Sequence, residues 1–130
     1  MADTFLLEVA TPERLLVREQ ATEVQVPAKN GYMGVLPGHA ALLSQLGIGV
    51  LDYVADGHRR FLAVAGGFLE VLPGHVRVLA DVAERAEDID AARARVALAR
   101  AQELIGGYDP DVALAAMGRA QSRIAAAERK

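Results

Sequence analysis

The chain has 130 residues, a formal net charge of −3 at neutral pH and 52% hydrophobic residues, which suits one domain or a small domain with an appendage. It has no cysteine, so disulfides, thiol chemistry and cysteine metal sites are excluded. The acidic balance argues against a nucleic-acid binder, and we identify neither a membrane-spanning run nor a signal peptide.

The first 86 residues have the pattern of an all-β domain. Short β-branched runs alternate with turn residues about every eight to twelve positions, which predicts about eight to ten strands. Asp56-Gly57 and Pro73-Gly74 each predict a hairpin, and Lys29–Gly31 predicts another turn. The expected strands include residues 5–10, 14–19, 22–28, 47–54, 59–65, 67–72 and 75–81. This pattern is typical of an antiparallel two-sheet β-sandwich.

From residue 87 onward, alanine replaces most of the glycine and proline, and the pattern becomes helical. Asp88 is the expected N-cap of a first helix, with Asp90 in its first turn. Gly106-Gly107 ends that helix, and Asp109-Pro110 begins a second helix that runs to about residue 127. Two helices joined by so short a connection form an antiparallel hairpin.

The apolar faces of both helices consist mainly of alanine. The expected stripes are Ala94, Leu98, Ala101 and Ile105 on the first helix, and Ala113, Ala116, Ala120, Ile124 and Ala127 on the second. Methyl groups bury little area, so we expect a hairpin that is held weakly and can detach. The sequence therefore predicts an α+β protein, with a β-sandwich over residues 1–86 and a two-helix hairpin over residues 87–130.

The sequence contains no recognisable catalytic or metal-binding pattern. His39, His58 and His75 each lie at or beside a turn, and they form neither an HxH nor an HxxxH pair, which disfavours a metal site. Ser44 and Ser122 lack a nucleophile-elbow context, and no GxxxxGK[ST] phosphate loop is present. We therefore expect a protein that is not an enzyme.

Three stretches together resemble the epsilon subunit of bacterial F-type ATP synthase. They are GYMGVLPGHAALLSQLGIGVL (31–51), GGFLEVLPGHVRVLAD (66–81) and AERAEDIDAARA (83–94). The resemblance covers essentially the whole chain in order. It departs at Ala41, where the family usually has proline, and at Ala65, where many members have serine.

The resemblance implies a non-catalytic central-stalk subunit of a proton-translocating ATP synthase. The sandwich would contact the gamma subunit and the ring of c subunits. The hairpin would extend toward the beta and alpha subunits and inhibit ATP hydrolysis. Such a subunit would be peripheral, at the cytoplasmic face of the bacterial inner membrane, and would contact the membrane only through the complex. It would require no cofactor and bind no nucleic acid.

The resemblance also implies a docking role for the glycine-rich segment at residues 31–39. If Tyr32, Met33 and Leu36 are exposed on a loop, they provide an adaptable apolar contact. His39 would add a polar contact at the c-ring end. The alternative is an ordinary tight hairpin whose apolar residues are tucked in.

The start of the first helix matches the I/L-D-x-x-R-A motif by which some family members bind ATP between the two helices. The resemblance implies contacts from Ile89, Asp90, Arg93, Ala94, Arg100 and Arg123, with a weaker one from Glu84. Arginine suits the geometry of a polyphosphate. The second function hypothesis is therefore an ATP-sensing regulatory protein whose hairpin closes around ATP.

The alternative to an ATP-binding role is an ordinary solvated helix face on which Asp90 pairs with Arg93. Ala127 stands where ATP-binding members carry a further arginine. Arg119 or Arg129 could replace that arginine, so binding of a regulatory ATP stays open at this point.

Overall fold

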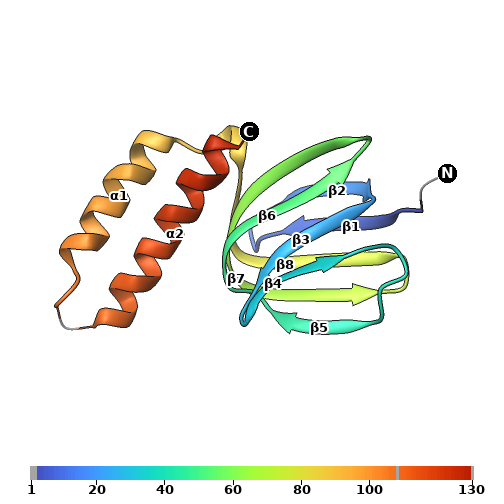
Figure 1. The fold of residues 1–130 in the computed structure, drawn as a ribbon, viewed down its shortest axis with the longest axis horizontal. Helices are drawn as coiled ribbons and strands as arrows, with labels where there is room; N and C mark the ends of the chain where they lie inside the picture. The colour runs from blue at the N-terminus through green and yellow to red at the C-terminus, as the bar shows by residue number, and fades with distance from the viewer. Residues whose placement is uncertain (1–2, 108, 130) are drawn as a thin grey trace.

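The computed structural model describes residues 3–107 and 109–129, so positions 1–2, 108 and 130 of the two predicted domains lie outside the described residues. Figure 1 shows a β-sheet structure with two helices at one side. The strands are β1 (Phe5–Ala10), β2 (Leu15–Ala21), β3 (Glu23–Ala28), β4 (Gly31–Val35), β5 (Leu42–Gln45), β6 (Ile48–Ala55), β7 (His58–Leu72) and β8 (His75–Arg85). The helices are η1 (Ala86–Asp88), α1 (Ala91–Glu103) and α2 (Pro110–Glu128).

The strands confirm the predicted sandwich, with one difference in strand direction. Their order is β2-β1-β8-β7-β6-β3-β4, and β5 pairs with β7. The sheet is mixed because β1 and β8 run parallel, whereas the other pairs are antiparallel. β2 also contacts β6, which lies four places away in this order: the Tyr53 hydroxyl donates to Glu19 at 2.5 Å, and, just after β2, Thr22 N–H donates to the Val54 carbonyl at 2.9 Å.

β7 is one continuous strand where the sequence predicts two. Its first half pairs with β6 as far as Ala65, and its second half pairs with β5 from Phe68 onward. Between them, Gly66 and Gly67 have φ angles of 71° and 109°. A Cβ atom at Gly67 would overlap the carbonyl oxygen of Leu79. Only glycine fits this corner, where the strand passes from one partner strand to the next while β8 pairs with both of its halves.

The predicted hairpin turns are confirmed. Asp56 and Gly57, with φ angles of 51° and 74°, join β6 to β7, and Pro73-Gly74 joins β7 to β8. Alternate residues of the strands fill the interior of the sandwich. The largest fully buried side chains include Leu7, Leu51, Leu62, Leu69, Val9, Val24 and Val26.

The two helices form an antiparallel hairpin, and α2 lies between α1 and the sandwich (Figure 1). Asp90 is the N-cap of α1, because its carboxylate accepts a hydrogen bond from Arg93 N–H at 3.1 Å. The expectation of Asp88 as the N-cap is wrong, since Asp88 belongs to the preceding η1 turn. Asp109 caps α2 and accepts from the N–H groups of residues 111 and 112, as predicted.

The hairpin packs on the sandwich through a second, smaller apolar cluster. This cluster contains Val50 and Ala63 from the sandwich, Ala86 and Ile89 from the junction, and Ala126 and Ala127 from α2. The predicted stripes are largely confirmed, with Ala94, Ala101, Ala113 and Ala120 buried. Ile105 is an exception, because α1 ends at Glu103 and Ile105 is exposed.

Candidate functional site

A cleft of about 310 Å³ lies where α2 crosses β7 and β8. Its walls are mainly small apolar side chains, and its polar groups come from Glu84, Arg119, Ser122 and Arg123. Ala97 brings α1 to its edge, so residues from the sandwich and from both helices line the same space. The remaining lining residues are Ala63, Val64, Ala65, Val82, Ala116 and Ala120.

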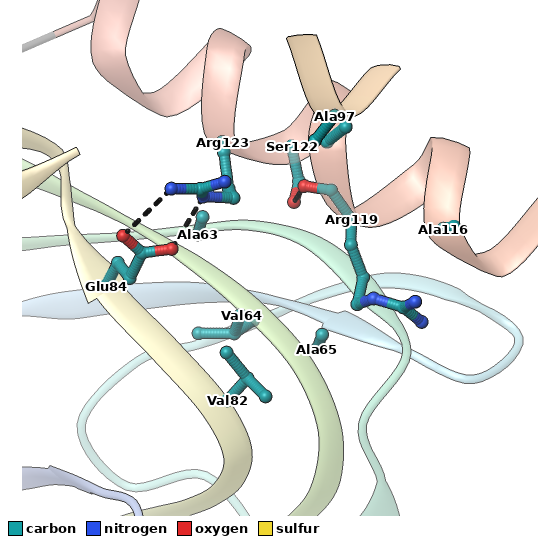
Figure 2. Close-up of a pocket in the computed structure, with 11 residues that line it drawn as sticks. Ala63, Val64, Ala65, Val82, Glu84, Ala97, Ala116, Arg119, Ser122 and Arg123 are labelled. Atoms are coloured by element: carbon teal, nitrogen blue, oxygen red, sulfur yellow. Dashed lines mark hydrogen bonds and ion pairs between the residues drawn. The ribbon is translucent and has the colours of Figure 1, made fainter. Parts of the chain in front are cut away.

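Glu84 and Arg123 join the sandwich to the hairpin at one side of this cleft (Figure 2). Arg123 Nε lies 2.6 Å from one carboxylate oxygen of Glu84, and Arg123 Nη2 donates to the other at 3.5 Å. The buried Nε proton has no acceptor in hydrogen-bonding geometry, so the short contact is an ion pair. Figure 2 shows the Arg119 guanidinium pointing away from this pair.

The other polar residues implied for ATP lie on α1 and outside the cleft lining. Asp90, Arg93 and Arg100 are exposed. Arg93 and Arg100 each lie about one helical turn from Ala97, the α1 residue that borders the cleft. Asp90 contacts the backbone N–H of Arg93, so its carboxylate serves as a helix cap.

The apolar residues implied for ATP lie within packed layers. Ile89 is 6% exposed and belongs to the cluster between the hairpin and the sandwich. Ala94 is fully buried. Ala127 belongs to the same cluster as Ile89, whereas Arg119 lines the cleft. Arg119 is therefore placed to contribute the second guanidinium of the cleft.

The implied docking segment is divided between a strand and a turn. Tyr32 lies in β4 and is 56% exposed, yet its hydroxyl accepts a hydrogen bond from Val50 N–H at 3.1 Å. Met33 is partly buried and packs against the main core, which agrees with the alternative of a tucked-in side chain at this position. The reason is strand alternation: Met33 pairs with inward-facing Val26, whereas Tyr32 pairs with Pro27.

Leu36 and His39 belong to the turn between β4 and β5. His39 N–H donates to the Leu36 carbonyl at 3.1 Å, and Gly38 has a φ of 84°, which gives a Pro-Gly turn. Leu36 is 61% exposed, and His39 Nδ1 lies 2.7 Å from the Ala40 carbonyl. This turn lies at the end of the sandwich away from the helices (Figure 1).

A second surface feature, which the sequence analysis missed, crosses the outer face of β7, β8, β1 and β2. The strand register aligns Phe68, Leu79, Ala10 and Leu15 as cross-strand neighbours. Phe68, Leu79 and Leu15 are about half exposed, at 50%, 52% and 48%. We call these three residues the apolar row. Alternation within each strand indicates which residues face outward. Only the pairing between strands that are far apart in sequence shows that these three residues lie side by side.

A charged row runs beside the apolar row on the same face. Glu8 accepts from Arg18 Nη1 at 3.1 Å and lies 2.5 Å from His75 Nε2. Arg77 Nε lies 3.6 Å from Glu8, and Arg77 Nη1 lies 3.9 Å from Glu70. The hydrogen bond from His75 is the main cause that lowers the pKa of Glu8 below its usual 4.5.

The fold and these surfaces define a β-sandwich with an appended helix hairpin. The sequence model for "ATP synthase, Delta/Epsilon chain, beta-sandwich domain" matches residues 4–86. The ATP synthase epsilon chain of Solibacter usitatus is 63% identical over 134 aligned residues that cover all of both chains. That of Koribacter versatilis is 47% identical over 85% of this chain and 78% of its own.

Solved structures agree with the sequence comparisons. A chain in the Euglena gracilis mitochondrial ATP synthase, in the part comprising OSCP, F1 and the c ring, matches with a TM-score of 0.78 and 25% identity. The match covers 97% of this chain and 80% of that one. A chain in the Tetrahymena thermophila mitochondrial ATP synthase central stalk and c ring matches with a TM-score of 0.55 and 11% identity, over 66% of this chain and 69% of that one, and shows a shared fold.

The chain belongs to the ATP synthase epsilon chain family. Members of this family are non-catalytic subunits of ATP synthase. In the described part of this chain, no helix is long and apolar enough to cross a bilayer. Within the same residues, no three histidine or acidic side chains gather as metal ligands would.

Proposed function

We propose that the chain couples the gamma subunit to the c ring through its sandwich and restrains ATP hydrolysis through its hairpin. The observation that supports this most strongly is the division of the molecule into two parts. A large core holds the sandwich together, whereas a small, alanine-rich cluster holds the hairpin against it. A weakly held hairpin can leave its site while the sandwich stays docked.

The apolar row and the β4–β5 turn are the proposed docking surfaces for the gamma subunit and the c ring. Half-exposed Phe68 and Leu79 offer a large apolar contact, and the neighbouring charged row can fix the orientation of a partner. Tyr32, Leu36 and His39 keep their proposed role in contacting the ring. In a bacterial cell, the assembled subunit would lie at the cytoplasmic face of the inner membrane and handle no substrate of its own.

Co-purification with the rest of the synthase tests these surfaces. A Leu79→Glu substitution puts a charge into the apolar row and should reduce recovery of the gamma subunit at least about tenfold, as expected when a central interface residue is lost. Leu36→Glu should mainly weaken retention of the c ring. The matched control is Leu114→Glu on α2, which is 58% exposed and should leave assembly unchanged. Wild-type recovery of the Leu79 variant would contradict the assignment of this face.

A second candidate function, an ATP sensor, has support from the cleft. Two arginines and a serine hydroxyl border an alanine-lined space of about 310 Å³. Guanidinium groups suit phosphate, and small apolar walls suit a purine face. The guanidinium groups of Arg119 and Arg123 point in different directions, and that of Arg123 is paired with Glu84. For both groups to contact one ATP molecule, Arg123 would have to leave Glu84.

Calorimetry of the isolated chain with ATP checks the sensor. We expect heat of binding at millimolar ATP, and about a tenfold loss of affinity for Arg119→Ala, as for the loss of one charge-assisted contact. Arg95→Ala is the control, since Arg95 is exposed on α1 and does not line the cleft. An absence of heat, or equal losses in both variants, would reject ATP binding in the cleft.

A further inference from the structure

Two consecutive residues at the end of β8 contact different parts of the molecule. Arg85 is fixed to the sandwich, because its Nε and Nη2 atoms donate to the Leu16 carbonyl oxygen at 3.1 and 2.6 Å. Glu84 instead reaches the hairpin, where its carboxylate contacts Arg123 of α2. The chain therefore has a fixed point at residue 85, immediately beside a charged contact to the hairpin.

The Glu84–Arg123 pair differs in kind from the other contacts that hold the hairpin. Over residues 3–107 and 109–129, it is the ion pair that links a strand to a helix of the hairpin, whereas the others link strands or join Arg85 to Asp88 at the junction. The rest of the interface is mainly small and apolar, such as Gly118 beside Ile48. Arg129 lies over the Phe61 ring at 5.9 Å and adds one cation–π contact.

The position of the pair makes it accessible to dissolved ions. The Glu84 and Arg123 side chains are 31% and 25% exposed, and both border the cleft. At this exposure, added salt weakens the attraction, because ions approach within the screening length. Arg119 at the same cleft raises the local positive charge and would attract small anions that compete with Glu84 for Arg123.

We propose that Glu84 and Arg123 form a salt-sensitive latch that sets how often the hairpin leaves the sandwich. When salt or an anion weakens the pair, the remaining alanine contacts hold α2 less firmly. Arg85 keeps the sandwich side of the junction in place, so the movement begins at residues 86–90. Only the consequence of the latch, control of ATP hydrolysis, rests on the proposed function; the latch itself is a property of the isolated chain.

Hydrogen exchange of the isolated full-length chain, measured by mass spectrometry at low and high sodium chloride, tests the latch. In the wild type, exchange of the α2 amides should become faster as salt rises. Glu84→Gln keeps the shape but removes the charge, and should make α2 exchange about two- to fivefold faster at low salt, as for loss of a partly exposed pair. In the same variant, the exchange rate of the α2 amides should no longer depend on salt. If Glu84 acted only through packing, that dependence on salt would remain.

Two controls make the result specific. Glu103→Gln removes an exposed charge at the end of α1, away from the pair, and should behave like the wild type. The exchanged pair Glu84→Arg with Arg123→Glu should restore slow exchange. The inference would be overturned by wild-type exchange in Glu84→Gln, by an α2 exchange rate in the wild type that ignores salt, or by equal acceleration in the sandwich. If the latch behaves as expected but the hairpin has no effect on hydrolysis, only the proposed regulation fails.

Discussion

Glu8 lies among three basic side chains, from β8 and β2, on the outer face of the sandwich. The hydrogen bond from His75 has the largest effect on its pKa, and Arg18 and Arg77 also lower it, while partial burial acts in the opposite direction. The pKa of Glu8 is therefore lower in the folded protein than its usual 4.5. A carboxylate of this kind stabilises the fold above that pH, and its contribution disappears as the pH falls through the folded-state pKa.

This linkage predicts a measurable effect of Glu8 on acid stability. In urea unfolding from about pH 5 down to about pH 3, the free energy of unfolding of Glu8→Gln should fall less steeply than that of the wild type. Glu13→Gln, at the exposed turn between β1 and β2, is the control and should keep the wild-type slope. If Glu8→Gln also keeps that slope, the charged row does not stabilise the native state through Glu8.

At the scale of the elements, Asp88 and Asp90 have different roles just before α1, because only Asp90 caps the helix. Asp90→Ala should remove the N-cap and cost about 1 kcal/mol of helix stability, whereas Asp88→Ala should cost much less. Hydrogen exchange of the first-turn amides of α1 measures the difference. Equal effects of the two substitutions would mean that the side-chain contact from Asp90 to Arg93 N–H does not stabilise this helix.

The elements also show which features of the fold a local sequence pattern can predict. Both helices, the Asp109 cap and the tight turns could be predicted, because each depends on residues close together in the chain. The sequence predicts separate strands at residues 59–65 and 67–72, with Gly66 between them, and glycine commonly marks a bend or weak point in a strand. The structure uses it as a corner, and this choice depends on the partners β5, β6 and β8. The parallel pairing of β1 with β8 depends on residues far apart in sequence and has no local signal.

At the scale of the whole molecule, the candidate site was predicted in part. Arg123 and Glu84 could be proposed from the resemblance, but their direct contact could not, because it depends on how α2 packs on β6 and β7, beside the end of β8. Arg119 lies one turn before Arg123 and could be placed on the same helix face from spacing alone. The exposed apolar row depends on four aligned strands, so local alternation could not identify it.

In the function proposed above, the hairpin must leave the sandwich in order to restrain ATP hydrolysis. The chain has no cysteine, so an introduced pair can lock the hairpin in place. A Cβ atom on Gly118 would lie 3.5 Å from Ile48 Cγ2 and 3.9 Å from its Cδ1, so side chains at positions 48 and 118 face each other across the contact between β6 and α2. The double variant Ile48→Cys with Gly118→Cys is therefore suited to forming a disulfide between α2 and β6.

The decisive measurement is the ATP hydrolysis rate of the synthase assembled with this double variant, before and after reduction of the disulfide. We expect faster hydrolysis with the disulfide formed and slower hydrolysis once reduction frees the hairpin. Each single-cysteine variant should show no such response to the reductant. Equal rates in the locked and freed complexes, or slower hydrolysis in the locked one, would show that the hairpin does not restrain hydrolysis by leaving the sandwich.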